Sequence, residues 1–138
     1  MRLLKDAKIE LIKSVPLFSH CTKGQLAALA AEADELSVAE GKNLTRQGEP
    51  GREFIVIVEG AAEVVKDGRR IASLRSGDFL GELALLSGSP RTATVNTTAP
   101  SRLLVLTERG FRRVASDIPS LQASLLKALS VRLAADAL

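Results

Sequence analysis

The feature that most constrains the fold is a series of short apolar segments between residues 34 and 106, separated by glycine, proline and other turn-forming residues. The segment 54–58 is too rich in β-branched residues for a helix and predicts a buried strand. The Asp67-Gly68 pair suits a two-residue hairpin turn. About seven or eight such segments, roughly 8 to 12 residues apart, predict an antiparallel sandwich or jelly-roll barrel. The expected strands are residues 35–38, 54–58, 61–66, 71–74, 92–96 and 103–106, with a turn at 48–51.

Helices are predicted on both sides of these strands. Apolar residues recur at helical spacing up to Pro16, and Thr22 with Gln25 has the form of a capping box before a second helix over residues 23–32. A short helix is expected from residue 107 or 108 to about residue 116, and Pro119 opens a last one. The apolar stripe of the last helix contains Leu121, Leu125, Leu129 and Leu133, widened by Leu126.

The expected class is therefore α+β, with residues 1–138 as a single domain. N-terminal helices occupy residues 1–33, a β-barrel of about eight strands occupies residues 34–106, and C-terminal helices occupy residues 107–138.

The histidine and cysteine content excludes several kinds of site. His20 and Cys21 are the only residues of their types, so disulfides and zinc sites with three or four His or Cys ligands are excluded. Their neighbouring side chains point apart, which argues against a Cys-His nucleophile pair. We expect both residues to lie in a loop between two helices. No catalytic motif or carboxylate pair stands out, so we expect no enzyme, no metal and no cofactor.

The charge pattern is that of an ordinary solvated surface. Nineteen basic and sixteen acidic residues give a net charge of +3, with both signs mixed along the chain. The local cluster of Arg109, Arg112 and Arg113 fits either an exposed helix face or a phosphate-binding patch. Because no uncharged apolar run is long enough to span a bilayer and the first residues are charged, we expect a cytoplasmic protein that contacts neither membrane nor nucleic acid.

The segment 81–95 does not fit a plain barrel. Residues 82–86 are good helix formers between two strands, and the first N–H groups of a short helix bind anions. Gly81 lets a ligand approach the backbone, and Arg91 presents a planar fork of donors. Together they predict a site for a singly charged phosphate, where Glu82 would accept hydrogen bonds from a sugar hydroxyl. The alternative is that Glu82 complements the helix dipole and pairs with Arg91.

This segment resembles the phosphate-binding cassette of the cyclic nucleotide-binding domain family, shared by the bacterial cAMP receptor protein, regulatory subunits of cAMP-dependent protein kinase and cyclic nucleotide-gated channels. The family pattern, Gly-Glu-Leu-Ala-Leu-(Leu/Ile)-x-Gly-x-Pro-Arg-(Ala/Thr/Ser)-Ala-Thr-Val, is matched from Gly81 to Val95 without a gap. The resemblance extends to the flanking helices and to Gly60, and it implies a double-stranded β-helix. Leu80 stands where the family commonly has phenylalanine, which we expect to affect packing and not binding.

The resemblance implies a role for each matching residue. Arg91 would grip an equatorial phosphate oxygen, while the backbone N–H groups of Leu83 and Ala84 would hold the phosphate and the Ala93 backbone would lie against it. Glu82 and the Gly81 backbone would take the ribose 2′-hydroxyl, and the Thr92 hydroxyl would reach the base. The positions matched to the base surface are Val64, Ile71 and Ala72, and those matched to a lid are Arg132 over the purine, with Leu129, Leu133 and Asp136 nearby.

The implied function is a sensor that binds a 3′,5′-cyclic nucleotide and relays occupancy through its C-terminal helices, with Leu85 and Leu86 passing on the shift. Thr92 suits the guanine amino group, but cAMP is the commoner ligand of bacterial-type modules, and we favour cAMP over cGMP. The alternatives are a ligand-free protein-interaction module, or the sensor fragment of a longer transcription regulator or other effector. The implied partner is an unknown effector protein or fused domain.

The apolar stripe of the last helix allows two arrangements. It fits a homodimer seam through the C-terminal helix as well as packing on the barrel.

Overall fold

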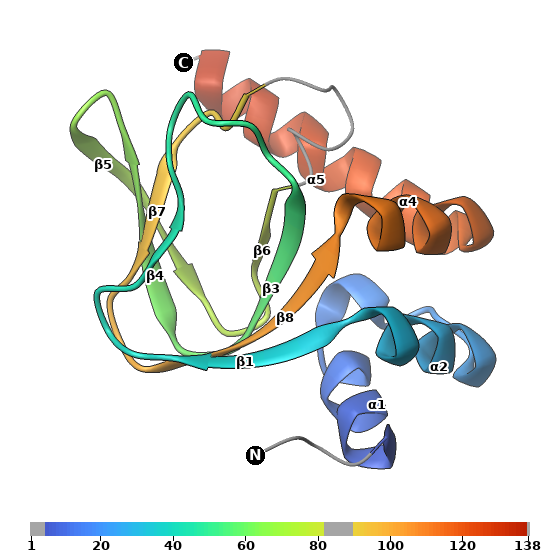
Figure 1. Ribbon diagram of the computed structural model, residues 1–138. Helices are drawn as coiled ribbons and strands as arrows, with labels where there is room; N and C mark the ends of the chain where they lie inside the picture. The colour runs from blue at the N-terminus through green and yellow to red at the C-terminus, as the bar shows by residue number, and fades with distance from the viewer. Residues whose placement is uncertain (1–4, 82–89, 138) are drawn as a thin grey trace.

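Within the residues that the structure describes, eight strands pair in the nested order of a jelly roll. The structure is a computed structural model that describes residues 5–81 and 90–137. Strand β1 pairs with β8, β2 with β7, β3 with β6 and β4 with β5, all antiparallel. Two four-stranded sheets result, ordered β1-β8-β3-β6 and β2-β7-β4-β5 (Figure 1). The strands are β1 (Asp34–Val38), β2 (Asn43–Thr45), β3 (Glu53–Glu59), β4 (Ala61–Lys66), β5 (Arg69–Arg75), β6 (Phe79–Leu80), β7 (Thr94–Thr97) and β8 (Ser101–Thr107).

The jelly-roll prediction is confirmed, although the strands form two sheets and not one closed barrel. The sequence does not predict β2, β6 or a short 3₁₀ helix, because elements of two or three residues are too short to show a periodicity. The predicted strand 92–96 begins later, at Thr94.

Helices α1, α2 and α4 lie together on one side of the sheets, with α2 and α4 side by side, while α5 runs from there past the upper end of the sheets (Figure 1). The predicted capping box is present: Gln25 N–H donates to Thr22 Oγ1 and Thr22 N–H to Gln25 Oε1. A second cap, which was not predicted from the sequence, is formed where Gly110 N–H donates to Thr107 Oγ1. In the described ranges, none of the helices has the length and apolar character of a bilayer span. The helices are α1 (Lys5–Lys13), η1 (Pro16–Phe18), α2 (Lys23–Glu32), α4 (Glu108–Asp117) and α5 (Pro119–Ala137). The side chains of residues 5, 6, 128, 129 and 131–137 lie outside the description.

Strand β3 is buried on both faces. Successive side chains of a strand point to opposite sides, so Phe54 and Val56 face the helices while Ile55 and Ile57 face the second sheet. All four are at most 4% exposed, and fully burying a side chain of this kind contributes about 1.5–3 kcal/mol. The near-continuous apolar run of β3 therefore belongs to two separate cores, one under the helices and one between the sheets.

The apolar face of α5 differs from the prediction. Leu121 and Leu125 are each 2% exposed and belong to the core under the helices. Leu126 is 62% exposed, so the prediction that it widens this face is wrong. Leu129 and Leu133 lie outside the described side chains. The described half of the stripe therefore packs on the chain itself.

The remaining polar predictions concern exposed parts of the helical region. His20 is exposed and Cys21 half-buried between η1 and α2, as expected for loop residues, and burial raises the pKa of the Cys21 thiol. The arginine cluster of α4 is an exposed helix face, where Arg112 pairs with Glu108 and Arg113 with Glu32. The first ion pair links two residues of α4, and the second joins α4 to α2.

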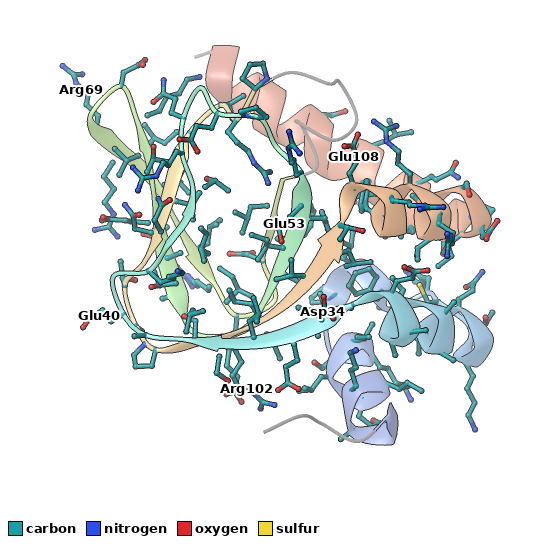
Figure 2. All side chains as sticks on the ribbon, viewed as in Figure 1. Asp34, Glu40, Glu53, Arg69, Arg102 and Glu108 are labelled. Carbon is teal, nitrogen blue, oxygen red and sulfur yellow. The ribbon has the colours of Figure 1, made fainter. Side chains whose placement is uncertain are left out.

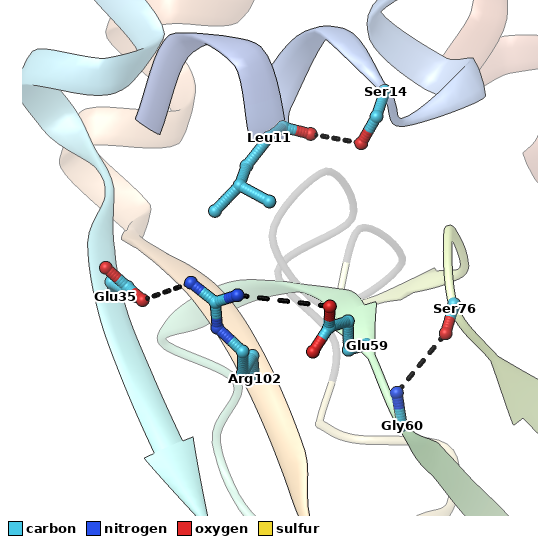
Figure 3. A network of polar contacts seen from close by, with 7 residues as sticks. All are labelled: Leu11, Ser14, Glu35, Glu59, Gly60, Ser76 and Arg102. Atoms are coloured by element: carbon cyan, nitrogen blue, oxygen red, sulfur yellow. Dashed lines mark hydrogen bonds and ion pairs between the residues drawn. The ribbon is translucent and has the colours of Figure 1, made fainter. Parts of the chain in front are cut away.

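A polar network ties three strands together at the end of β3 (Figure 3). Arg102 on β8 lies 2.9 Å from Glu35 on β1 and 3.9 Å from Glu59 on β3, measured between guanidinium nitrogens and carboxylate oxygens. The hydrogen bond to Glu35 raises the pKa of Arg102. Nearby, the Gly60 N–H donates to Ser76 Oγ at 3.2 Å, which holds the chain where it passes from one sheet to the other.

Gly60 is expected to tolerate no side chain. Its φ is +122°, and an added Cβ would lie 2.1 Å from Ser101 Oγ and 2.9 Å from Ser101 Cα. Gly60→Ala should lower the free energy of unfolding by about 2–3 kcal/mol in urea denaturation. The control is Gly24→Ala in α2, where a Cβ meets nothing within 4 Å. That variant should be neutral or more stable by up to about 1 kcal/mol. Equal stabilities of the two variants would contradict the prediction.

Candidate functional site

The guanidinium of Arg91 is buried and directed into the protein. Arg91 is 9% exposed, and its Nη2 donates to the backbone carbonyl of Glu53 at 2.8 Å. Glu53 is the first residue of β3 and is labelled in Figure 2. The charge that the sequence predicts for a phosphate site therefore sits beside the start of the central strand.

The backbone of Arg91 is held by the turn at residues 48–51. The Arg91 N–H donates to the Glu49 carbonyl at 2.8 Å, and the Gly48 N–H donates to the Arg91 carbonyl at 2.8 Å. Two residues further on, Thr45 Oγ1 donates to the Ala93 carbonyl at 3.0 Å. These bonds continue the pairing of β2 with β7 towards Arg91, so the arginine is fixed on a paired backbone and not on a free loop.

Gly81 closes the site on the third side. Its φ is +102°, and an added Cβ would lie 2.4 Å from the Glu53 carbonyl oxygen and 2.6 Å from Arg91 Nη1. Glycine is therefore required here both by the backbone conformation and by the lack of space. Gly81 after the end of β6 and Glu53 at the start of β3 therefore both lie next to the guanidinium of Arg91, whose own backbone leads into β7.

The residues predicted to support the base lie on the second sheet. Val64 on β4 is half-buried and stands opposite Ala72 on β5 and Val95 on β7. The register between β4 and β5 shifts next to Val64, and Ile71, at this irregularity, is 52% exposed. The structure therefore brings Val64 and Ala72 together, while Ile71 offers an exposed apolar side chain on the same hairpin.

Other predicted site residues are only partly placed. Ala93 is buried and Thr92 exposed, both between Arg91 and the start of β7. Glu82, Leu83, Ala84, Leu85 and Leu86 lie outside the described residues, and so do the side chains of Arg132 and Asp136 in α5.

Sequence reasoning misses Glu53, Glu49 and Gly48 as parts of this site. All three act through backbone groups, which any residue type offers, so residue identity carries no signal of the contact. Only the turn at 48–51, which the sequence does predict, marks the place where two of them lie.

An aromatic contact links the neighbourhood of Arg91 to the C-terminal helices. Phe54, the residue after Glu53, has its ring centroid 4.7 Å from that of Phe111 on α4. The ring centroid of Phe79 on β6 lies 5.6 Å from that of Phe54 as well. Such distances are typical of favourable aromatic pairs. Helix α4 therefore packs against Phe54, and the neighbouring residue, Glu53, is the one whose carbonyl accepts the hydrogen bond from Arg91.

Comparison with known proteins identifies the family. The model of the cyclic nucleotide-binding domain matches residues 35–117, which is more than half of the chain. The chain belongs to the cyclic nucleotide-binding domain family. This stretch of the domain runs from β1 to the end of α4 and includes Arg91, Gly81 and Val64.

Relatives of this cyclic nucleotide-binding domain include regulatory subunits of protein kinases. It is 39% identical over 112 residues to the cAMP-dependent protein kinase regulatory subunit of Mycosarcoma maydis, covering 75% of this chain and 21% of that protein. A co-crystal structure of the regulatory domain of Toxoplasma gondii PKA with cAMP has 26% identity and a TM-score of 0.81, covering 91% of this chain and 49% of that one.

The fold of the domain is shared more widely. The Catabolite Activator Protein of Thermus thermophilus is 23% identical and superposes with a TM-score of 0.77, covering 86% of this chain and 58% of that chain. The chain thus spans about a fifth of the kinase subunit, at 21%, and about half of each of the two solved chains.

Proposed function

We propose that this domain is a cytoplasmic sensor that reversibly binds a 3′,5′-cyclic nucleotide, cAMP in preference to cGMP, and relays occupancy through α4 and α5. The observation that carries the proposal is the inward, 9% exposed guanidinium of Arg91. A guanidinium is a planar fork of donors whose geometry and positive charge match the oxygens of a phosphate. A cyclic phosphodiester, with a single negative charge, is a ligand of this kind.

The surroundings of Arg91 support phosphate binding. The guanidinium of Arg91 donates to the Glu53 carbonyl, and in this proposal the same planar group also donates to a phosphate oxygen. The hydrogen bond to the Glu53 carbonyl anchors one nitrogen of the guanidinium, and the lack of space at Gly81 limits its displacement. In this proposal the N–H groups of Leu83 and Ala84 and the carboxylate of Glu82 complete the phosphate and ribose site.

The base would lie on the second sheet. Val64 and Ala72 stand opposite one another across β4 and β5, and the exposed side chain of Ile71 is on the same hairpin. Thr92 is exposed and directly follows Arg91, and in this proposal its hydroxyl contacts the base. The assignment of Arg132 as a lid residue remains a prediction from the family resemblance.

The proposed relay runs through the start of β3. A ligand that pulls on Arg91 acts on the Glu53 carbonyl, and Phe54 follows directly in the chain. The Phe54 ring contacts Phe111, which is 2% exposed on α4, and α4 in turn contacts α5. A ligand shifts such an equilibrium only by binding one arrangement more tightly than the other. A movement of α4 is then read by an effector, either a separate protein or a further domain of the same chain.

Loss of the buried charge should abolish most of the affinity. Arg91→Leu is expected to weaken cAMP binding at least about tenfold in isothermal titration calorimetry, because charge-assisted hydrogen bonds contribute about 1.5–3 kcal/mol each. The matched control is Arg112→Leu, which removes an exposed arginine paired with Glu108 and should leave binding unchanged. Undiminished binding by a folded Arg91→Leu variant would refute the role of Arg91.

Thr92 is expected to set base preference. Thr92→Ala should weaken cGMP about two- to tenfold while leaving cAMP within about twofold, since only one neutral hydrogen bond to guanine is lost. Competition of both nucleotides for the wild type and the variant measures this ratio. Thr98→Ala, at another exposed threonine just after β7, serves as the control. A ratio unaffected by Thr92→Ala would remove this residue from the selection of the base.

The aromatic contact is expected to carry the relay. In hydrogen exchange of the wild type, cAMP should alter the protection of α4, and Phe111→Leu should reduce this response while affinity stays within about threefold. Phe18→Leu, in the same core but without a ring contact to Phe54, controls for the loss of stability. If Phe111→Leu responds as fully as the wild type, the relay takes another route.

A further inference from the structure

The tip of the β4–β5 hairpin is joined to the loop before the 48–51 turn by two reciprocal hydrogen bonds. Gln47 Nε2 donates to Asp67 Oδ1 at 2.7 Å, and the Asp67 N–H donates to Gln47 Oε1 at 2.9 Å. Asp67 and Gly68 have φ values of +52° and +78°, which is the two-residue turn that the sequence predicts. We call this pair of hydrogen bonds between Gln47 and Asp67 the clasp.

The clasp continues into the backbone that holds Arg91. The Gln47 N–H donates to Thr94 Oγ1 on β7 at 3.0 Å. The next two residues, Gly48 and Glu49, make the two backbone hydrogen bonds to Arg91. A run of three residues, 47–49, therefore bonds to the hairpin tip, to β7 and to the arginine at once.

The hairpin needs such an anchor because it lies at the edge of its sheet. Among the strands of the described residues, β5 is the last in the order β2-β7-β4-β5 and has β4 as its one neighbour. Arg69, just after the turn, marks a tip that projects away from the helices (Figure 2). Among the described residues, the hydrogen bonds between Gln47 and Asp67 connect this tip to the loop of Arg91.

We infer that Gln47 is a positioning residue, whose clasp with Asp67 fixes the base-supporting hairpin relative to the loop that holds Arg91. The inference rests on the proposed function, in which Val64 and Ala72 support the base while Arg91 holds the phosphate. A cyclic nucleotide is rigid, so both contacts form together only when hairpin and loop are correctly spaced. A hairpin that is released part of the time lowers the apparent affinity by the fraction that remains competent.

The test is to swap the carboxylate and the amide between the two positions by mutation. Gln47→Glu loses the N–H donor and places two carboxylates together, whereas Asp67→Asn keeps an acceptor for Gln47 and tolerates a positive φ. In the double variant Gln47→Glu with Asp67→Asn, an amide again faces a carboxylate. We expect Gln47→Glu to weaken cAMP binding about three- to tenfold, Asp67→Asn to stay within about twofold, and the double variant to recover to within about twofold of the wild type.

The single Asp67→Asn variant separates the clasp from plain charge. If added negative charge near an anionic ligand were the cause, Asp67→Asn would tighten binding as much as Gln47→Glu weakens it, and this result would overturn the inference. A second readout needs no ligand: exchange of the Asp67 and Arg91 amides should accelerate in Gln47→Glu and return to normal in the double variant. Unchanged exchange in Gln47→Glu would likewise overturn it.

The wild type is titrated first with cAMP and cGMP, which separates the two proposals. If it binds neither, the proposed function is wrong, and the inference about its site falls with it. If it binds and Gln47→Glu binds equally well, only the positioning role of Gln47 is wrong.

Discussion

A buried guanidinium must be received by hydrogen-bond acceptors, and the Glu53 carbonyl is one acceptor that receives Arg91. The bond also fixes where the charge lies, because Glu53 begins the strand that is buried on both faces. Gly81 has no side chain since one would occupy the same space as the guanidinium and the carbonyl. The position of a single charge thus constrains three segments of the chain.

Because β3 is buried on both faces, the hydrogen bond between Arg91 and the Glu53 carbonyl is connected to both cores of the domain. One face of the strand packs between the sheets and the other packs under the helices, so β3 cannot shift without disturbing both cores. Phe54 stands at the end nearest Arg91 and touches Phe111 on α4. In the proposed relay, a shift at the Arg91 end of β3 would reach α4 through this ring contact.

The second sheet is fastened in a different way. Its edge hairpin contributes fewer buried side chains, since β5 is exposed along most of its length. Polar bonds therefore hold it, and those of Gln47 and Asp67 reach the loop that also holds Arg91. The binding surface would combine a rigid half, built on buried β3, with a half whose position depends on surface hydrogen bonds. Such surface bonds are individually weak, which makes the edge hairpin the easier part to move.

Local patterns in the sequence determined the longer helices and strands and the family. Two-sided apolar runs, the Asp-Gly turn, the Thr22 cap and Pro119 act on near neighbours, and the segment 81–95 carries a specific family pattern. The tertiary structure alone decided what Arg91 touches, because its partners at Glu53, Glu49 and Gly48 are backbone groups more than thirty-five residues away in the chain. The exposure of Leu126 and the pairing of Gln47 with Asp67 likewise depend on how distant segments meet. A sequence records side-chain chemistry, whereas these contacts follow from the path of the backbone in space.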